Sequence, residues 1–201
     1  MKKILALLIA TLLLLSAASA LAEGTLVYGS GDYTRINPAI DEHGEINLLI
    51  FNGLTAHDAD NNVVPCLAES WDYDEASHTY TFHLAQGVTF HDGEPFTAED
   101  VKFTIEAIMD PANESEIASN YTDVKEIRVV DDNTVAFELE GNNAAFLEYM
   151  TIGILPRHLL EGEDMQTSSY FRAPVGTGPY KLERWDEGQA ITLTKNENYF
   201  L

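Results

Sequence analysis

Alternating apolar and polar side chains predict three β-hairpins along the chain. In the clearest case Tyr80, Phe82 and Leu84 occupy every second position, and threonine or histidine fills the positions between them. Short runs of turn-forming residues, rich in Asp, Asn and Gly, separate the paired stretches. The three predicted hairpins pair residues 70–73 with 79–84, 124–130 with 134–139, and 180–185 with 191–194.

Helical spacing is clearest in the stretch that begins at Thr97. Thr97 is a good N-cap, and Asp100 three residues later completes a capping box. Pro111 ends this helix, because proline cannot continue the hydrogen-bond ladder. Shorter helices are predicted at residues 144–150 and 157–160. The buried stripe of the long helix is predicted to consist of Val101, Ile105 and Ile108.

Two further elements are predicted before the first hairpin. Residues 25–30 alternate and are rich in strand formers, which predicts a first strand. Residues 45–54 place apolar side chains at helical spacing, with Gly53 as the stop. The mixture of scattered hairpins and intervening helices favours an α+β fold.

Residues 1–22 have the features of a signal peptide. Two lysines precede an apolar run at residues 4–15, and Ala20 and Ala22 form a small-residue cleavage site. The apolar run is well short of the ~20 residues that a membrane-spanning helix needs, which disfavours a membrane anchor. We therefore expect the chain to be exported to the periplasm or the cell exterior, with cleavage near Ala22.

The chain is strongly acidic, with 33 Asp and Glu against 11 Lys and Arg and a formal net charge of −22. This charge repels nucleic acid and anionic lipid headgroups, and it is compatible with a cationic or zwitterionic ligand. Cys66 is the only cysteine, so no intrachain disulfide can form. Its apolar neighbours favour a small buried core residue over a reactive thiol or an intermolecular pairing point.

Catalytic and metal-binding patterns are weak in this sequence. The six histidines include no H-x-x-x-H or HExxH spacing, although His43 and His91 could join a site assembled in three dimensions. Neighbouring carboxylates such as Asp131 and Asp132 fall in turns, which favours solvated turn residues over a glycosidase pair. No G-x-S-x-G elbow of a serine hydrolase is present. We therefore predict no catalytic residue, no metal site and no cofactor.

A Gly-Thr-Gly stretch at residues 176–178 resembles half of a phosphate-binding loop. Both nucleotide-binding arrangements, however, require a helix directly after the glycines. Pro179 and a predicted strand follow here instead. The glycines are better explained by a close approach of the backbone, either to a crossing strand or to a bound ligand, and the residue types leave both open.

Five stretches, taken in order, cover nearly the whole chain after the predicted signal peptide. They are residues 26–38 (LVYGSGDYTRINP), 64–71 (VPCLAESW), 80–84 (YTFHL) with 87–93 (GVTFHDG), 96–101 (FTAEDV), and 176–180 (GTGPY) through 196–199 (NENY). In this order the stretches resemble one family of the extracellular solute-binding proteins of ABC importers, the family that carries oligopeptides, dipeptides and nickel.

The resemblance implies a type II periplasmic-binding-protein-like fold, in which two lobes close over a ligand like a hinged clamp. Residues 23–51 would begin the first lobe, residues 52–166 would form a subdomain inserted in it, and residues 167–201 would return to it. Family members are much longer, and their second lobe would follow these residues. We therefore expect this chain to be an amino-terminal fragment, truncated before the second lobe.

The resemblance also implies a non-enzymatic function, the capture of short peptides for delivery to an ABC permease in the membrane. A nickel chelate or another small solute is the alternative within the family. The complete protein is expected to be a monomer. By position, Asp32, Tyr33, Thr177 and Gly178 would line the ligand cleft, with Tyr33 supplying a flat apolar wall. From other classes, a secreted hydrolase and an exported structural domain without a ligand stay open.

Overall fold

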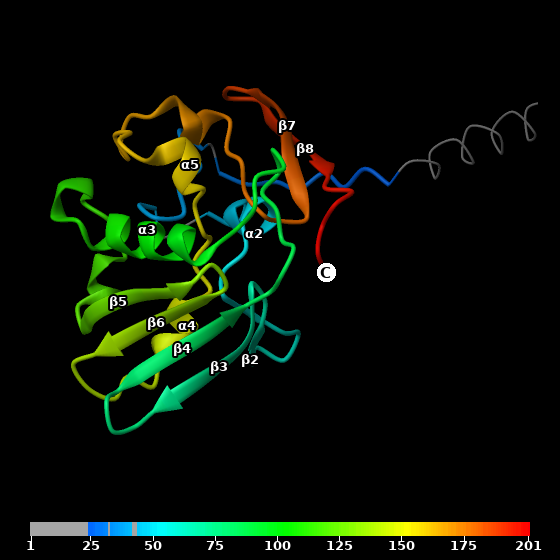
Figure 1. The fold of residues 1–201 in the computed structure, drawn as a ribbon. Helices are drawn as coiled ribbons and strands as arrows, with labels where there is room; N and C mark the ends of the chain where they lie inside the picture. Colours follow the sequence, from blue (N-terminus) through cyan, green and yellow to red (C-terminus); the bar gives the residue numbers. More distant parts are fainter. Residues whose placement is uncertain (1–23, 32, 42–43) are drawn as a thin grey trace, which may run out of the picture. The chain divides into compact units, whose positions relative to one another are not determined.

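The structure of the protein is a computed structural model, drawn in Figure 1. It contains two compact units, Met1–Asp32 and Tyr33–Leu201. The signal peptide predicted for residues 1–22 and the predicted ligand residue Asp32 lie outside the described residues. The residues that the structure describes are 24–31, 33–41 and 44–201.

The strand predicted at residues 25–30 is not formed. Residues 24–31 have neither helix nor strand, and Leu26 and Val27 are each 89% exposed. Alternation shows which side chains a strand would bury, but a strand forms only where its backbone pairs with a neighbour. The prediction is wrong because the pattern carries no information about such a neighbour.

A four-stranded antiparallel sheet dominates the second unit (Figure 1). Its strand order is β3-β4-β6-β5, so two hairpins join through the pairing of β4 with β6. That pairing sets Phe82 opposite Val135 and Tyr80 opposite Phe137. Both of the hairpins predicted for this region are confirmed. The strands are β3 (Ala68–Asp74), β4 (Thr79–Leu84), β5 (Val124–Asp131) and β6 (Thr134–Leu139).

The buried side chains of this sheet project from one of its two faces. Phe82, Val135 and Phe137 are fully buried there, and the Phe82 and Phe137 rings meet edge to face with centroids 5.8 Å apart. The opposite face is polar. On it His83 Nε2 lies 2.9 Å from the carboxylate of Asp72. The alternation along each strand therefore separates a buried face from a solvated one, as the sequence predicts.

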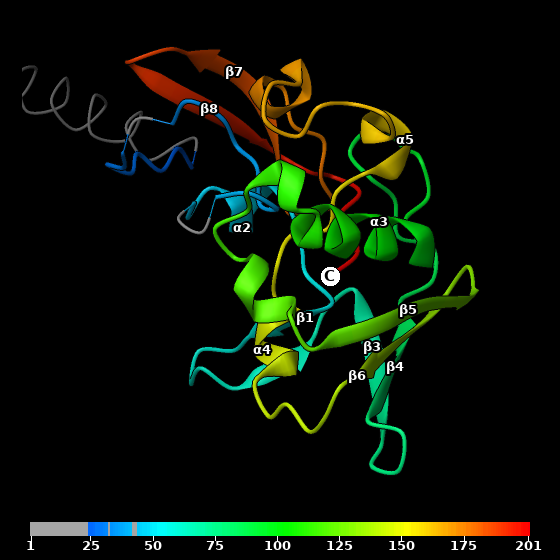
Figure 2. The same cartoon turned by 90° about the vertical axis from the view of Figure 1, so that its left-hand side faces the viewer.

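Helix α3 (Ala98–Met109) lies along the sheet, over β5 and β6 (Figure 2). The predicted capping box is present, because the Thr97 N–H donates to the Asp100 carboxylate at 2.9 Å. The helix ends at Asp110, and Pro111 opens a short 3-10 helix directly afterwards. The predicted stripe is confirmed, since no surface is exposed by Val101, Ile105 and Ile108.

The helix predicted at residues 45–54 is a single turn, α2 (Asn47–Ile50). The backbone becomes extended at Phe51, where φ is −119° and ψ is 158°. Gly53 is not a helix stop. A Cβ at Gly53 would lie 2.5 Å from the carbonyl oxygen of Met150, so this glycine allows two backbones to pack closely. Tertiary packing therefore ends the helix earlier than the apolar spacing predicts.

Smaller hairpins and helices complete the second unit. The third predicted hairpin is confirmed, and an additional short hairpin follows α2. Both short predicted helices are present, and a 3-10 helix, η3, precedes the third hairpin. These elements are β1 (Thr55–His57), β2 (Val63–Pro65), α4 (Phe146–Tyr149), α5 (Arg157–Leu160), η3 (Ser169–Arg172), β7 (Tyr180–Asp186) and β8 (Ala190–Lys195).

A continuous hydrophobic core runs through the second unit. Ile50 from α2, Phe82 from β4 and Phe171 from η3 all belong to it. Cys66 is a buried free thiol with 5% of its surface exposed, which confirms the predicted core position. Side chains from all three segments implied by the family resemblance share this core, and the division into those segments stays a prediction.

In the part of the chain that the structure describes, no helix is long and apolar enough to cross a membrane.

Candidate functional site

The Gly-Thr-Gly stretch forms a turn just before β7, and we call residues 176–178 the GTG turn. Its backbone docks on the end of α2, where the Gly178 N–H donates to the Ile50 carbonyl at 2.8 Å. The Asn52 N–H donates to Thr177 Oγ1 at 3.3 Å. The turn is therefore held to α2 and the residues after it by hydrogen bonds.

Both glycines are required by the closeness of this contact. A Cβ at Gly176 would lie 1.9 Å from the Ile50 carbonyl oxygen, and a Cβ at Gly178 would lie 2.5 Å from the Leu49 carbonyl oxygen. Packed side-chain and backbone atoms do not approach so closely. The close approach that the sequence left open, to a crossing strand or to a ligand, is thus made to the backbone of α2.

His91 makes three hydrogen bonds to the GTG turn. Its main-chain N–H donates to the Gly176 carbonyl at 2.8 Å, and the Gly176 N–H donates to its Nδ1 at 3.2 Å. Its Nε2 lies 3.0 Å from the Gly178 carbonyl oxygen. Because Nδ1 accepts a hydrogen bond, the ring proton is assigned to Nε2, which donates to Gly178. Burial lowers the pKa of His91, which favours this neutral ring.

Further polar side chains tie the GTG turn to its surroundings. Lys181 Nζ donates to the His91 carbonyl at 3.1 Å, and Asn196 Nδ2 donates to the Gly178 carbonyl at 3.0 Å. The Tyr170 hydroxyl donates to the Val175 carbonyl at 2.6 Å, and burial keeps the pKa of Tyr170 well above its usual range. The residues on both sides of the turn are therefore fixed as well.

Asn52 places a second polar group beside the turn. Its Nδ2 donates to the Tyr199 hydroxyl at 3.3 Å. Its Oδ1 is buried and has no hydrogen-bond partner among the described residues. Burial raises the pKa of Tyr199 and of the Cys66 thiol, so both stay neutral at neutral pH. Near Asn52, the surroundings of the turn are therefore polar but uncharged.

The structure places the predicted ligand residues in different settings. Thr177 is only 1% exposed, and Gly178 is fixed through both its N–H and its carbonyl. Tyr33 is half-buried and packs against the core. Asp32 lies outside the described residues. A ligand-binding role for these four residues stays a prediction.

Sequence reasoning missed the roles of His91, Asn52 and Tyr199. From the sequence, His91 is a candidate only for a metal ligand, because it precedes the carboxylate of Asp92. Its contact with Gly176 of the GTG turn joins positions 85 residues apart, and no local sequence pattern predicts such a contact. Asn52 and Tyr199 are 147 residues apart, and their hydrogen bond is likewise not predictable from local sequence.

Several acidic and imidazole side chains pair with each other or with turn backbone in the structure. The described residues contain no group of three or more His, Cys, Asp or Glu placed to hold a metal ion. His57 Nε2 lies 2.6 Å from Glu148 Oε2, and His158 Nε2 lies 2.8 Å from Asp92 Oδ2. The Asp131 carboxylate accepts the Asn133 N–H at 2.9 Å, which is the turn-forming role that the sequence favours.

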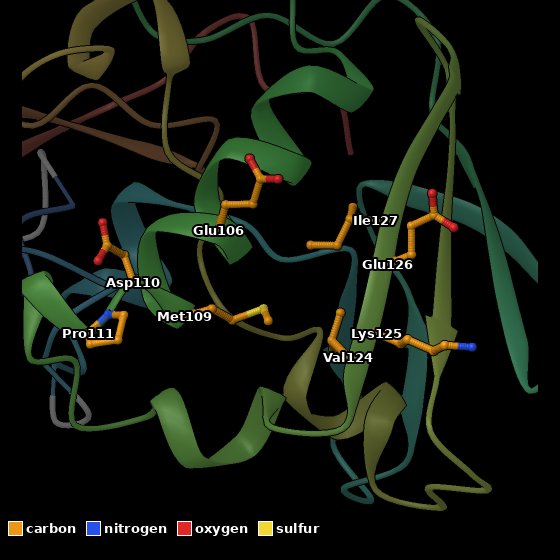
Figure 3. A pocket seen from close by; sticks show the side chains of 8 residues that line it. All are labelled: Glu106, Met109, Asp110, Pro111, Val124, Lys125, Glu126 and Ile127. Atoms are coloured by element: carbon orange, nitrogen blue, oxygen red, sulfur yellow. The ribbon is translucent and has the colours of Figure 1, made fainter.

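A cavity of about 380 Å³ lies between the end of α3 and β5 (Figure 3). The side chains of Met109 and Ile127 point toward each other across it. Three of its lining residues are acidic, and the one cation, Lys125, pairs with Glu138 at 2.5 Å. The cavity shares no residue with the GTG turn. It is lined by Glu106, Met109, Asp110, Pro111, Val124, Lys125, Glu126 and Ile127.

The chain matches the family model described as bacterial extracellular solute-binding proteins, family 5 Middle, over residues 62–200. Among curated proteins, the oligopeptide-binding protein AppA of Bacillus subtilis is 33% identical over 187 residues, which is 88% of this chain and 34% of AppA. The chain spans about a third of the length of the curated relatives it matches.

Solved structures show the same likeness. NikZ from Campylobacter jejuni, in complex with Ni(L-His), matches with a TM-score of 0.83 and 40% identity, over 86% of this chain and 35% of NikZ. DppA from Helicobacter pylori, in complex with the peptide STSA, matches with a TM-score of 0.73 and 31% identity, over 85% of this chain and 38% of DppA. The mixed α and β fold predicted from the sequence thus matches solute-binding protein structures over about a third of their length.

Proposed function

This chain belongs to family 5 of the bacterial extracellular solute-binding proteins, and from that premise we propose that it serves in solute capture for an ABC importer. The family consists of non-enzymatic binding proteins of ABC transporters. The observation that carries the proposal is the family match over residues 62–200, which includes the GTG turn and all four strands of the central sheet. We propose that a membrane permease receives the solute from this protein.

A short peptide is the solute that we propose first. AppA is named as an oligopeptide-binding protein, and the DppA structure contains the peptide STSA. A zwitterionic peptide also suits a chain with a net charge of −22. A nickel chelate is the second candidate, because NikZ, which matches at 40% identity, holds Ni(L-His).

We propose that Thr177, Gly178 and Tyr33 border the solute site, and Asp32, which lies outside the described residues, remains a candidate from the sequence. Rigid attachment of the turn to α2 supports this placement, since a binding surface needs groups that are held in fixed positions. Tyr33 would supply a flat apolar wall and a polar hydroxyl. The proposed arrangement assigns residues 23–51 and 167–201 to one lobe and residues 52–166 to a subdomain inserted in it.

Isothermal titration calorimetry of the purified chain tests the proposed function. We expect weak, saturable binding of trialanine, because this chain spans only about a third of the length of the relatives it matches. Stronger binding of Ni(L-His) than of trialanine would favour the nickel candidate. Absence of saturable binding of both solutes at millimolar concentration would contradict the proposal.

A substitution at Tyr33 tests its place in the proposed site. We expect Tyr33→Ala to weaken trialanine binding roughly tenfold, because one buried aromatic contact contributes about 1–2 kcal/mol. The melting temperature of Tyr33→Ala should also fall, since the side chain packs against the core, so binding is measured well below the melting temperature of the variant. Tyr33→Phe is the matched control, which keeps the ring and should keep most of the affinity. Unchanged affinity in Tyr33→Ala would remove this residue from the site.

A further inference from the structure

The hydrogen bonds between His91 and the GTG turn depend on the protonation state of the imidazole. The Gly176 N–H donates to Nδ1, and Nε2 donates to the Gly178 carbonyl, at 3.2 Å and 3.0 Å. Only the neutral ring with its proton on Nε2 can make both bonds. A protonated ring would set the Nδ1–H against the Gly176 N–H, and two donors repel each other.

The turn that contacts His91 is packed tightly on α2. Gly176 already packs so closely on α2 that even a Cβ would lie 1.9 Å from the Ile50 carbonyl oxygen. The Gly178 N–H is bonded to the same carbonyl at 2.8 Å. Protonation therefore breaks the bond between Nδ1 and the Gly176 N–H, and either the imidazole or the turn must shift.

The charged and titratable groups around His91 come from its own loop and from three elements. Asp92 follows it in the chain and pairs with His158 of α5 at 2.8 Å. Lys181 of β7 donates to the His91 carbonyl at 3.1 Å, and Tyr170 of η3 bonds to Val175 beside the turn. Burial has the largest influence and lowers the pKa of His91. The charge of Lys181 lowers it further, whereas the bond to Gly178 and the charge of Asp92 raise it.

We propose that His91 is a proton-sensitive positioning residue, whose neutral imidazole fixes the GTG turn through Gly176 and Gly178 and whose protonation breaks the bond with the Gly176 N–H and loosens the turn. The inference rests on the proposed function in one respect: if the turn borders the solute site, acidification should also weaken solute binding. The positioning role itself is a property of the turn and needs no solute.

The pH dependence has a definite sign. Burial lowers the pKa of His91 in the folded chain below its unfolded value of about 6.5. Below that pH the unfolded chain takes up the proton more readily than the folded chain does. The stabilising effect of the neutral ring is therefore complete above about pH 6.5 and is lost as the pH falls.

Nuclear magnetic resonance of the full chain between pH 5 and 8 tests the proposal. At about pH 7.5 the His91 ring should carry its proton on Nε2, and its midpoint should lie below about 6.5. The amide signals of Gly176 and Gly178 should shift with the same midpoint. Their protection factors, which compare each exchange rate with that of an unstructured amide at the same pH, should fall at least severalfold as the ring is protonated. A ring proton on Nδ1 at neutral pH, or glycine signals that do not follow His91, would overturn it.

Two variants separate His91 from its neighbours. His91→Gln keeps a donor for Gly178 but does not titrate, so the pH-dependent shift of the glycine amides should disappear. His158→Gln removes the nearby imidazole that contacts Asp92, and it should leave that shift in place. The reverse pattern would overturn the proposal, and the titration of the unsubstituted chain still decides it if either variant fails to fold.

Titration with trialanine at pH 7.5 and 5.5 distinguishes this inference from the proposed function. Glycine amides that follow His91, together with no solute binding at either pH, would support the positioning role and contradict the proposed function. Solute binding with glycine amides that do not follow His91 would support the function and overturn the positioning role.

Discussion

At the scale of single residues, the glycines of the GTG turn show how one residue type serves packing. Gly176 and Gly178 both lie against the backbone of α2, at distances that leave no space for a Cβ. Neither glycine is among those with a positive φ in the described residues. Their value at these positions is therefore the absent side chain and not a left-handed backbone.

Gly176→Ala tests this packing. The added Cβ would meet a backbone oxygen, which cannot rotate away as a side chain can. We expect the free energy of unfolding to fall by at least about 3 kcal/mol, the upper part of the usual cost of overpacking. Gly141→Ala is the matched control, because a Cβ at Gly141 meets no atom within 4 Å. Urea denaturation of both variants makes the measurement, and equal stability of the two would contradict the close contact.

The role of His91 cannot be determined from residue types alone. The sequence identifies an imidazole next to a carboxylate, which is compatible with a metal ligand, a surface histidine or a structural one. The structure shows that both ring nitrogens bond to the GTG turn. A role of this kind depends on a contact between distant parts of the chain, and one sequence contains no record of that contact.

At the scale of elements, α3 is held by a carboxylate with two functions. One oxygen of Asp100 accepts the Thr97 N–H and completes the capping box, at 2.9 Å. The other oxygen accepts the Arg157 N–H at the start of α5, also at 2.9 Å. Asp100 is only 5% exposed, so these bonds are shielded from water. The cap of one helix thus also fixes the beginning of another.

Asp100→Ala should therefore cost more than the loss of an ordinary cap. We expect a loss of about 2–4 kcal/mol, made up of about 1 kcal/mol for the cap and about 1–3 kcal/mol for the unsatisfied Arg157 N–H. Glu99→Ala is the control, because Glu99 is exposed in the same first turn and provides only a favourable charge near the helix N-terminus. Thermal unfolding followed by circular dichroism measures both, and a cost for Asp100→Ala no larger than for Glu99→Ala would contradict the second function.

Elements with strong local signals were predictable, and those that depend on distant partners were not. The three hairpins and α3 have clear periodicity together with turn or cap residues, and all of them are confirmed. The helix predicted at residues 45–54 is only α2, since Phe51 is extended and the Ile50 carbonyl accepts the N–H of the distant Gly178. The strand at residues 25–30 fails because alternation does not supply a pairing partner.

At the scale of the whole molecule, the net charge of −22 opposes a compact state at neutral pH. Salt weakens this repulsion, since the Debye length falls from about 30 Å at 0.01 M to about 8 Å at 0.15 M. We expect about 1 kcal/mol of added stability over this range of sodium chloride, or roughly 2–4 °C in melting temperature. Differential scanning calorimetry checks the shift.

The control for this effect is the same comparison near pH 4.5. Protonation of carboxylates there lowers the net negative charge, so the benefit of salt should shrink. A melting temperature that falls with salt at pH 7 would show that screened ion pairs, such as Arg35 with Asp41 at 2.7 Å, outweigh the general repulsion.

The sequence by itself determined the hairpins, the long helix, the core position of Cys66 and the resemblance to the family, because each depends on local periodicity or on residue order. Only the tertiary structure decided what the GTG turn packs against, how His91 and Asn52 reach it, and where α2 ends. The physical reason is that these contacts join residues tens of positions apart, and they arise from shape and hydrogen-bond geometry after the chain has folded.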